Sequence, residues 1–320
     1  MTLLRPFEAA ILVLALPVVI WCAGVIDPGM VFLLCEMLVI FLLAQMWNLL
    51  AGYAGQVSLG HQVFVGIGAF ALFHIANKTA IPLWLVLALV PVAVGLIAIP
   101  LGMIMFHLKY AYFAVGMWVV AEIVQQVFLM NRWLGGTSIV VLRPGGQPVS
   151  GFPEQIVFAV AAILAVALII GLRVFLRTRL GLATLAMRDN EAAARSAGVD
   201  VRRLHLGLFC VSAAGCALAG GLYYITTLTV GASTGFHINW VITMMVVTVI
   251  GGMGTLTGPA LGTLLLIGLR EAMTRAGWSG DQYWIVIGLL SVVVLLLYPR
   301  GLWPALSDLF MKLNRSKAKA

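Results

Sequence analysis

At its polar centre the chain reads Arg188-Asp189-Asn190-Glu191-Ala192-Ala193-Ala194-Arg195-Ser196-Ala197-Gly198. This stretch lies in residues 177–204, the longest polar interruption between apolar segments, and runs of Leu, Val, Ile and Ala flank it on both sides. Asp189 or Asn190 can cap the free N–H groups of a first helical turn, and Gly198 suits the left-handed position that ends a helix. We therefore expect a short, capped, Ala-rich helix between membrane segments.

The composition assigns the chain to the membrane proteins. Of 320 residues, 62% are hydrophobic and only 9% are charged, whereas soluble domains are roughly half apolar and a quarter charged. Several apolar runs exceed the roughly 20 residues that a helix needs to cross a bilayer. The sequence predicts an all-α, polytopic transmembrane bundle in one domain, residues 1–307, followed by a basic tail, residues 308–320, near anionic lipid.

Hydropathy predicts about ten spans. The third and ninth are short or rich in glycine, so they could be re-entrant or broken. The expected spans cover residues 7–26, 29–50, 57–76, 81–106, 110–130, 155–176, 205–228, 239–257, 259–274 and 283–299.

The formal net charge of +8 is explained by topology rather than by nucleic-acid binding. Seven arginines lie between Arg173 and Arg203, and five basic residues lie between Arg300 and Lys319. Basic loops face the cytoplasm, and an even number of expected spans separates these two regions. Both termini and the loop 177–204 are therefore expected in the cytoplasm, and residues 131–154 form the longest outward loop.

A second informative stretch runs from Gly52 to Ala69 and carries five glycines and four polar side chains near membrane depth. Glycine permits close helix packing or a break in a helix, and broken backbone is tolerated where protein or a wet cavity surrounds it. Gln56, Ser58 and His61 are thus either part of a transport path or partners in interhelical hydrogen bonds.

Few ionisable residues fall inside the expected spans, where they are costly. Glu122, Gln125 and Gln126 share one face of the fifth span, and they form either a polar lining or a buried clamp. Glu36 lies in the outer third of the second span. The neighbours Arg270 and Glu271, near an outer helix end, are interpreted as a local interface pair.

No nucleotide-binding or enzyme motif is present. The sequence lacks Gly-x-x-x-x-Gly-Lys-Ser/Thr, His-Glu-x-x-His and Gly-x-Ser-x-Gly. We expect no enzymatic activity, no metal and no cofactor. The capped helix at residues 188–198 suits a groove on another protein, and the alternative is a helix that lies on the membrane surface.

Three motifs then resemble a known family. They are Gly-x-x-Gly-Gln-x-Ser-Leu-Gly-His-x-x-Phe-x-Gly-Ile-Gly-Ala at residues 52–69, Arg-Asp-Asn-Glu followed by Ala-Ala-x-Ser-x-Gly-Val-Asp at 188–200, and Gly-Gly-Met-Gly-Thr with Gly-Pro at 251–259. Their order and sequence are similar to permeases of branched-chain amino acid ABC transporters, of the LivM type. The general importer pattern has three residues between Glu-Ala-Ala and Gly. This chain has four residues between Ala193 and Gly198, which matches the branched-chain subfamily.

The resemblance implies one permease subunit of an importer in the inner (plasma) membrane of a bacterium. Its partners would be a second, LivH-like permease, two ABC ATPases and an extracytoplasmic binding protein. The loop 177–204 would be the cytoplasmic coupling loop, and an ATPase would dock on Arg188, Asp189, Asn190, Glu191, Arg195 and Gly198. The path candidates are Gln56, Ser58, His61, Glu122, Gln125 and Gln126.

The cargo stays open among branched-chain or other hydrophobic amino acids and related small polar solutes. Relatives also move urea, amides and aromatic acids, and Gly135-Gly136-Thr137-Ser138 departs from the family's usual Thr-Gly-Gly-x-x-Gly. The alternative function is an ion-coupled secondary transporter with a broken helix at 52–60 and Glu122 as the coupling group. An intramembrane enzyme that uses His61 and Glu122 is the third hypothesis.

Overall fold

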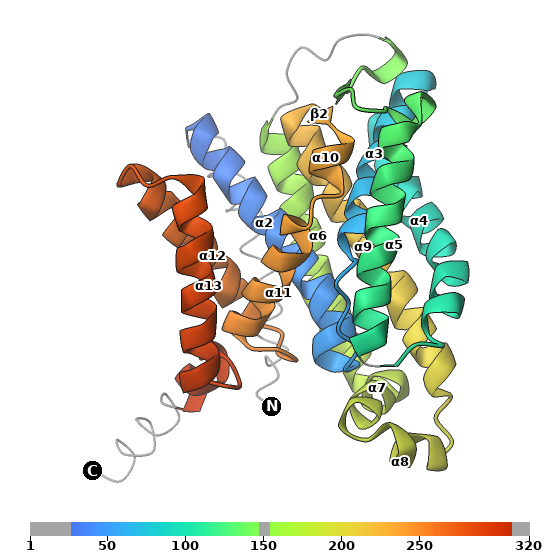
Figure 1. The fold of residues 1–320 in the computed structure, drawn as a ribbon, viewed down its shortest axis with the longest axis vertical. Helices are drawn as coiled ribbons and strands as arrows, with labels where there is room; N and C mark the ends of the chain where they lie inside the picture. Colours follow the sequence, from blue (N-terminus) through green and yellow to red (C-terminus); the bar gives the residue numbers. More distant parts are fainter. Residues whose placement is uncertain (1–26, 110, 147–153, 309–320) are drawn as a thin grey trace.

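The computed structural model describes residues 27–109, 111–146 and 154–308. They form a bundle of long helices that run along the longest axis of the molecule (Figure 1). In chain order the elements are α2 (Pro28–Asn48), the π-helical η1 (Leu49–Tyr53), α3 (Gln62–Lys78), α4 (Leu83–Met105), α5 (Ala111–Met130), η2 (Arg132–Leu134), β1 (Val140–Val141), η3 (Pro144–Gly146), α6 (Glu154–Arg177), α7 (Arg179–Asp189), α8 (Glu191–Ser196), α9 (Val201–Thr227), β2 (Thr229–Val230), α10 (Ala232–Gly235), α11 (Asn239–Gly251), α12 (Gly258–Arg275) and α13 (Gly280–Leu297).

The all-α class is confirmed, and seven helical stretches of the described residues are long and apolar enough to cross a membrane. They are α2 continued through η1, α4, α5, α6, α9, α10 with α11, and α13. The expected third and ninth spans fall outside this set. Helix α3 has only 17 residues, and α12 carries Arg270, Glu271 and Arg275 within its 18 residues. The total of about ten spans stays a prediction, because the first span, 7–26, lies outside the described residues, as does the tail after residue 308.

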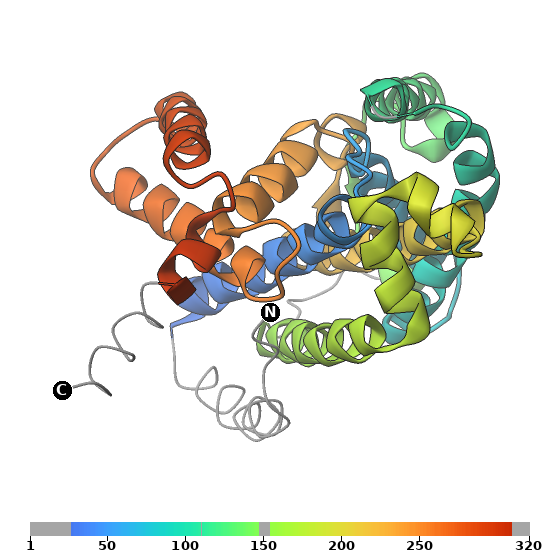
Figure 2. The same ribbon diagram turned by 90° about the horizontal axis from the view of Figure 1, so that it is seen from below.

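Helix α2 holds the bundle together. It lies against α6, α9, α11 and α12 (Figure 2), and Val39, Leu43 and Trp47 are almost completely buried. Its side chains belong to two apolar clusters. One joins α2 to α3, α4 and α9, and the other, which includes Ile40 and Ala44 of α2, joins it to α11, α12 and α13. The two parts of the bundle therefore share α2 as a common wall.

The outer helices keep large apolar side chains on the surface. Leu96 and Ile104 on α4, Ile123 on α5 and Leu296 on α13 are all more than half exposed. Contiguous apolar surface of this kind marks contact with lipid or with another membrane subunit. The protein is therefore a multi-pass membrane protein, and α2 and α9 are the most buried of its seven candidate spans.

A small ordered unit closes the end of the bundle where α3 finishes. Strands β1 and β2 pair antiparallel, with Val140 opposite Val230. The side chain of Asn77, on α3, donates to the carbonyl of Val141 at 2.8 Å and accepts from the N–H of Arg143 at 2.6 Å. The described part of the predicted outward loop is thus an ordered structure fixed to α3 and to the end of α9.

Helices α3 and α9 pack with their backbones in contact. A Cβ atom at Gly68 would lie 2.5 Å from the Cα atom of Ala217 and equally close to its carbonyl oxygen. Small residues allow this approach, which brings dispersion contacts and Cα–H contacts along the helix pair. Glycine at position 68 is therefore required by packing.

We predict that Gly68→Ala lowers the stability of the protein by about 1–3 kcal/mol, because the added methyl group forces two helix backbones apart. The measurement is the thermal midpoint of the detergent-solubilised protein. Gly207→Ala is the matched control: it lies on α9, and an added Cβ there meets no atom within 4 Å. Equal midpoints for the two variants would contradict the described α3–α9 contact.

Candidate functional site

The three sequence motifs meet where α2 ends. Asn48, in the last turn of α2, accepts a hydrogen bond from the N–H of Gly254 at 2.8 Å and donates one to the carbonyl of Thr255 at 2.9 Å. Gln45, one turn earlier, donates to the carbonyl of Leu256 at 2.6 Å. Both side chains are fully buried. Two amides of α2 thus hold the backbone of the turn between α11 and α12, which is the late glycine motif.

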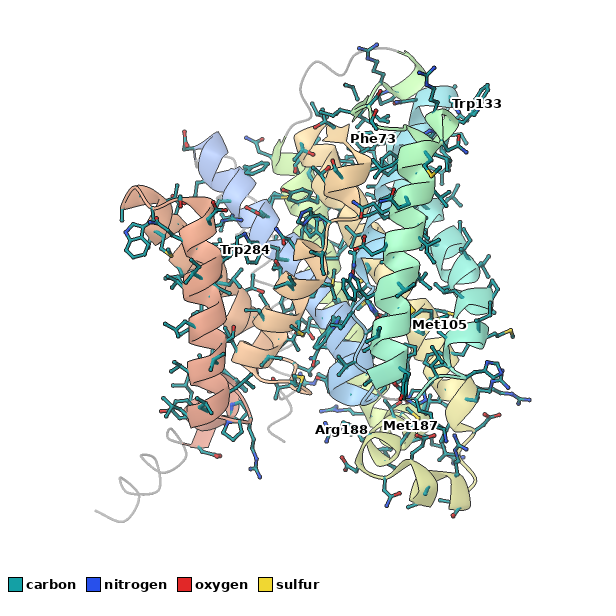
Figure 3. The ribbon with its side chains drawn as sticks, in the orientation of Figure 1. Phe73, Met105, Trp133, Met187, Arg188 and Trp284 are labelled. Atoms are coloured by element: carbon teal, nitrogen blue, oxygen red, sulfur yellow. The ribbon has the colours of Figure 1, made fainter. Side chains whose placement is uncertain are left out.

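Arg188 brings the polar loop into the same place. Its Nη1 atom donates to the carbonyl of Gly52 at 3.0 Å, while Nε and Nη2 bind Asp189. Figure 3 shows Arg188 beside Met187 where the loop meets the lower end of α2. A Cβ atom at Gly254 would lie 2.8 Å from Nη1 of Arg188 and 2.9 Å from the Gly52 oxygen. The close approach of the three motifs therefore requires a glycine at position 254.

The chain between α2 and α3 is not helical, and side chains bind its carbonyl groups. Helix α2 widens into the π-helix η1, and residues 54–61 then run without regular structure to α3. The indole N–H of Trp47 donates to the carbonyl of Ser58 at 2.9 Å, and Nε2 of His205 donates to that of Ala54 at 3.3 Å. The break predicted at residues 52–60 is present. Side chains of α2 and α9 bind two of its carbonyl groups, while Gly55 and Val57 are exposed.

His61 has a partner that fixes its proton. The hydroxyl of Ser212 donates to the carbonyl of Met46 at 2.7 Å, so Nε2 of His61 must be the donor in its 2.9 Å contact with Ser212. The ring packs edge-on against Phe64 and Phe209. His61 is fully buried and joins the start of α3 to α9, which is the interhelical hydrogen bond that the sequence left open as one alternative.

The expected capped helix at residues 188–198 exists as α8, and its N-cap is Asn190 rather than Asp189. Asn190 accepts from the N–H of Ala193 at 3.0 Å, whereas Asp189 pairs with Arg188. Gly198 has φ of 86° and ends the helix as predicted. The sequence did not separate α7, an 11-residue helix that precedes α8.

The exposed face of α8 carries an ion pair. Glu191 and Arg195 lie one turn apart, with Nη2 and Oε1 separated by 2.5 Å. Both line a small cavity of about 100 Å³ together with Gln56 and Lys109. The path candidate Gln56 is therefore a neighbour of the loop candidates.

The α5 candidates lie apart from this group. Glu122 accepts from the indole N–H of Trp118, one turn earlier, at 3.2 Å. Gln125 donates to the carbonyl of Ala232 at 3.4 Å, and Gln126 is exposed. An apolar cavity of about 170 Å³, lined by Leu59, Trp118 and residues of α11, separates α5 from α11 and from the break. The six path candidates do not form one site within the described chain.

Comparisons with known proteins match the sequence of this chain to one family. A family model described as branched-chain amino acid transport system / permease component matches residues 29–295. The chain belongs to this permease family. The permease is 26% identical to the high-affinity branched-chain amino acid transport system permease protein LivM of Escherichia coli (strain K12), over 98% of this chain and 78% of that protein.

Two more distant relatives cover about half of the permease. It is 28% identical to the high-affinity branched-chain amino acid transport system permease protein LivH of Escherichia coli (strain K12), over 57% of this chain and 62% of that protein. It is 30% identical to the xylose/arabinose import permease protein XylH of Sulfolobus acidocaldarius, over 53% of this chain and 50% of that protein. No solved structure gives a significant match.

We predict that Asn48→Leu destabilises the permease by about 2–4 kcal/mol, because it leaves the N–H of Gly254 and the carbonyl of Thr255 buried without partners. The readout is thermal unfolding of the purified protein. Asn77→Leu is a matched control, since Asn77 also binds two backbone groups, but in exposed surroundings where water can replace it. If Asn48→Leu lowers the thermal stability no more than Asn77→Leu does, the role assigned to Asn48 is contradicted.

Proposed function

We propose that this permease is the membrane-spanning subunit of an ABC importer for a branched-chain or other hydrophobic amino acid, or a related small polar solute. The observation that carries the proposal is the hydrogen bond from Arg188 to the carbonyl of Gly52. It joins the exposed α7–α8 loop to the non-helical segment between α2 and α3. A force applied to the loop would reach that segment through one side chain.

The α7–α8 loop is proposed as the docking site of a partner ATPase. Arg188, Asp189, Asn190, Arg195 and Gly198 are exposed and Glu191 is half-buried, so α8 offers a charged, well-capped surface. A short helix laid in a groove is a common mode of protein recognition. Because no nucleotide-binding motif occurs in the sequence, the energy for transport would come from this partner.

The distribution of charge supports a cytoplasmic position for the loop. Nine basic residues of the described chain lie in α7 and α8, in the adjoining ends of α6 and α9, or in the segments just before α5 and just after α13: Lys109, Arg173, Arg177, Arg179, Arg188, Arg195, Arg202, Arg203 and Arg300. Helices α7 and α8 lie at the lower end of the bundle in Figure 1. Toward the opposite end lie Lys78, Arg132, Arg143, Arg270, which pairs with Glu36, and Arg275. By the positive-inside rule, both termini would lie in the cytoplasm, and the membrane would be the inner membrane of a bacterium.

The proposed assembly contains a second, LivH-like permease, two ATPases and an extracytoplasmic binding protein. Similarity to both LivM and LivH supports a pair of related permeases. The ordered β1–β2 unit at the end opposite α7–α8 is a suitable surface for the binding protein. The exposed apolar side chains of α4, α5 and α13 would face lipid or the second permease.

The transport path is proposed along α5 and the break. Gln56, Ser58, His61, Glu122, Gln125 and Gln126 remain its candidate lining. The apolar cavity lined by Leu59 of the break and Trp118 of α5 supports this position. Ser58 and His61 are fully buried, so they would reach a path only when the segment 54–61 moves.

We predict that Glu191→Lys lowers uptake of radiolabelled leucine at least about tenfold, a change equivalent to about 1.4 kcal/mol, and reduces copurification of the ATPase. The substitution reverses the charge of the docking face while the protein still inserts. Glu271→Lys is the matched control, because Glu271 forms the same one-turn pair with Arg275 at the opposite end and is similarly exposed, 38% against 36%.

The opposite result would favour the alternative function. If membrane vesicles without ATPase subunits still take up leucine, if an ion gradient drives that uptake, and if Glu122→Gln uncouples it, the permease is an ion-coupled secondary transporter with a broken helix at 52–60. Equal loss of uptake in Glu191→Lys and Glu271→Lys would also contradict docking at α8.

A further inference from the structure

An ion pair lies inside the bundle at the end opposite α7–α8. Arg270 of α12 binds Glu36 of α2 with both Nη atoms, and the Nη1–Oε1 distance is 2.8 Å. The side chain of Glu36 is 12% exposed and that of Arg270 33%. Arg270 does not pair with Glu271, which binds Arg275 instead, so the expectation of a local Arg270–Glu271 pair is wrong. Charges at this depth are costly and mark candidate functional sites.

The ion pair forms part of the wall of a cavity of about 360 Å³, a size within the range of ligand pockets, roughly 300–1,000 Å³. Helices α2, α9, α11, α12 and α13 all contribute to it. Two edge-to-face aromatic pairs line it, Tyr223 with Trp240 at 4.8 Å and Tyr283 with Trp284 at 5.4 Å between ring centroids. Figure 3 labels Trp284 between α13 and α2. The cavity thus combines an ion pair, two aromatic pairs and enough volume for a small ligand.

A second cavity lies beside this one, toward the end of the bundle. It measures about 380 Å³, shares Tyr223, Asn239 and Trp240 with the first, and continues past Thr234 and His237 to Thr229 of β2. The three shared residues form a polar and aromatic wall between the two cavities. The second cavity therefore lies between the ion-pair cavity and the β1–β2 end, on the side opposite the α7–α8 loop.

The ion pair retains capacity to bind. A guanidinium group has five N–H donors, and two of those in Arg270 are used by Glu36. Each oxygen of Glu36 keeps a further lone pair. A carboxylate can accept the remaining N–H groups, and an ammonium group can donate to Glu36 or lie over an aromatic ring. A ligand with a single charge would leave one uncompensated charge in the apolar interior. A zwitterion carries both charges, so the ion pair and the ligand together remain neutral.

We propose that this cavity is a binding site for a zwitterionic amino acid, whose carboxylate binds Arg270 and whose ammonium group binds Glu36. Its side chain packs beside Ile40, Leu266 and Met273, the aliphatic residues of the wall. The proposal rests on the proposed function, since it takes the permease as an amino-acid importer, and it places a first stop for the cargo on the outer side. The headgroup of phosphatidylethanolamine carries the same pair of charges, so the experiment separates the two sources.

The test is protection of a cysteine in the cavity wall. Thr274→Cys is introduced into full-length permease whose Cys22, Cys35, Cys210 and Cys216 are replaced by alanine. Thr274 lines the cavity and is exposed. The protein is placed in phosphatidylglycerol nanodiscs, with any subunits that copurify and without ATP. The rate of maleimide labelling is then measured with L-alanine, L-leucine or L-phenylalanine.

At least one of these amino acids is expected to slow labelling threefold or more. Isopentylamine and 4-methylpentanoate, which each carry one of the two charges of leucine, are expected to have no such effect. Ser138→Cys is the matched control, because Ser138 is exposed in the loop before β1 and does not line either cavity. Protection by none of the three amino acids, or equal protection by a single-charge compound, overturns the proposal. Protection by phosphatidylethanolamine in place of an added amino acid also overturns it and assigns the cavity to lipid.

A charge exchange distinguishes ligand binding from a structural ion pair. The double variant Glu36→Arg with Arg270→Glu keeps an ion pair but reverses its direction, so we expect wild-type thermal stability and loss of protection. Retained protection would overturn the role of these two residues. Labelling requires no ATP, so the two proposals can fail separately. If amino acids protect the cysteine of Thr274→Cys but the permease shows no ATP-driven uptake, only the proposed function is overturned. If ATP-driven uptake is present but no amino acid protects that cysteine, only the amino-acid site is overturned.

Discussion

The structure depends on one constraint: backbone groups released from a helix inside a membrane must find partners within the protein. The chain leaves helical geometry between α2 and α3, and its carbonyls at Gly52, Ala54 and Ser58 are bound by side chains from other elements. The donors are Arg188, His205 and Trp47. Because these donors come from α7, α9 and α2, satisfying the break also positions the polar loop against the end of the bundle.

Helix α2 is fixed to the α11–α12 hairpin along its length. Asn48 and Gln45 bind the hairpin turn at one end, and Glu36 binds Arg270 near the other end. Between them, the hydroxyl of Thr248, which donates to the carbonyl of Met244 at 2.7 Å, also lies 3.2 Å from the carbonyl oxygen of Ala44. The glycine turn, the break and the ion pair are therefore parts of one unit, and a displacement of the α7–α8 loop would act on α2 at its lower end.

Much of the local structure could be predicted from the sequence. The apolar runs predicted the helical class, and their lengths identified α3 and α12 as unusual. The predicted cap and end of the loop helix are also present, because Asn190 caps α8 and Gly198 ends it. The sequence did not separate α7 from the loop, because its apolar and polar residues show little amphipathic pattern. It also did not pair Glu36 with Arg270, since a residue's depth in a helix does not specify its partner.

Composition and local pattern thus determined a helical membrane protein with a capped polar loop, because burial of apolar runs and helix capping depend on neighbouring residues. Only the tertiary structure decided the site. Arg188 meets Gly52 across 136 residues, Asn48 meets Gly254 across 206, and Glu36 meets Arg270 across 234. Such pairs form where packed helices bring them together, and the packing is set by small residues such as Gly68 and Gly254, whose partners the order of the chain does not reveal.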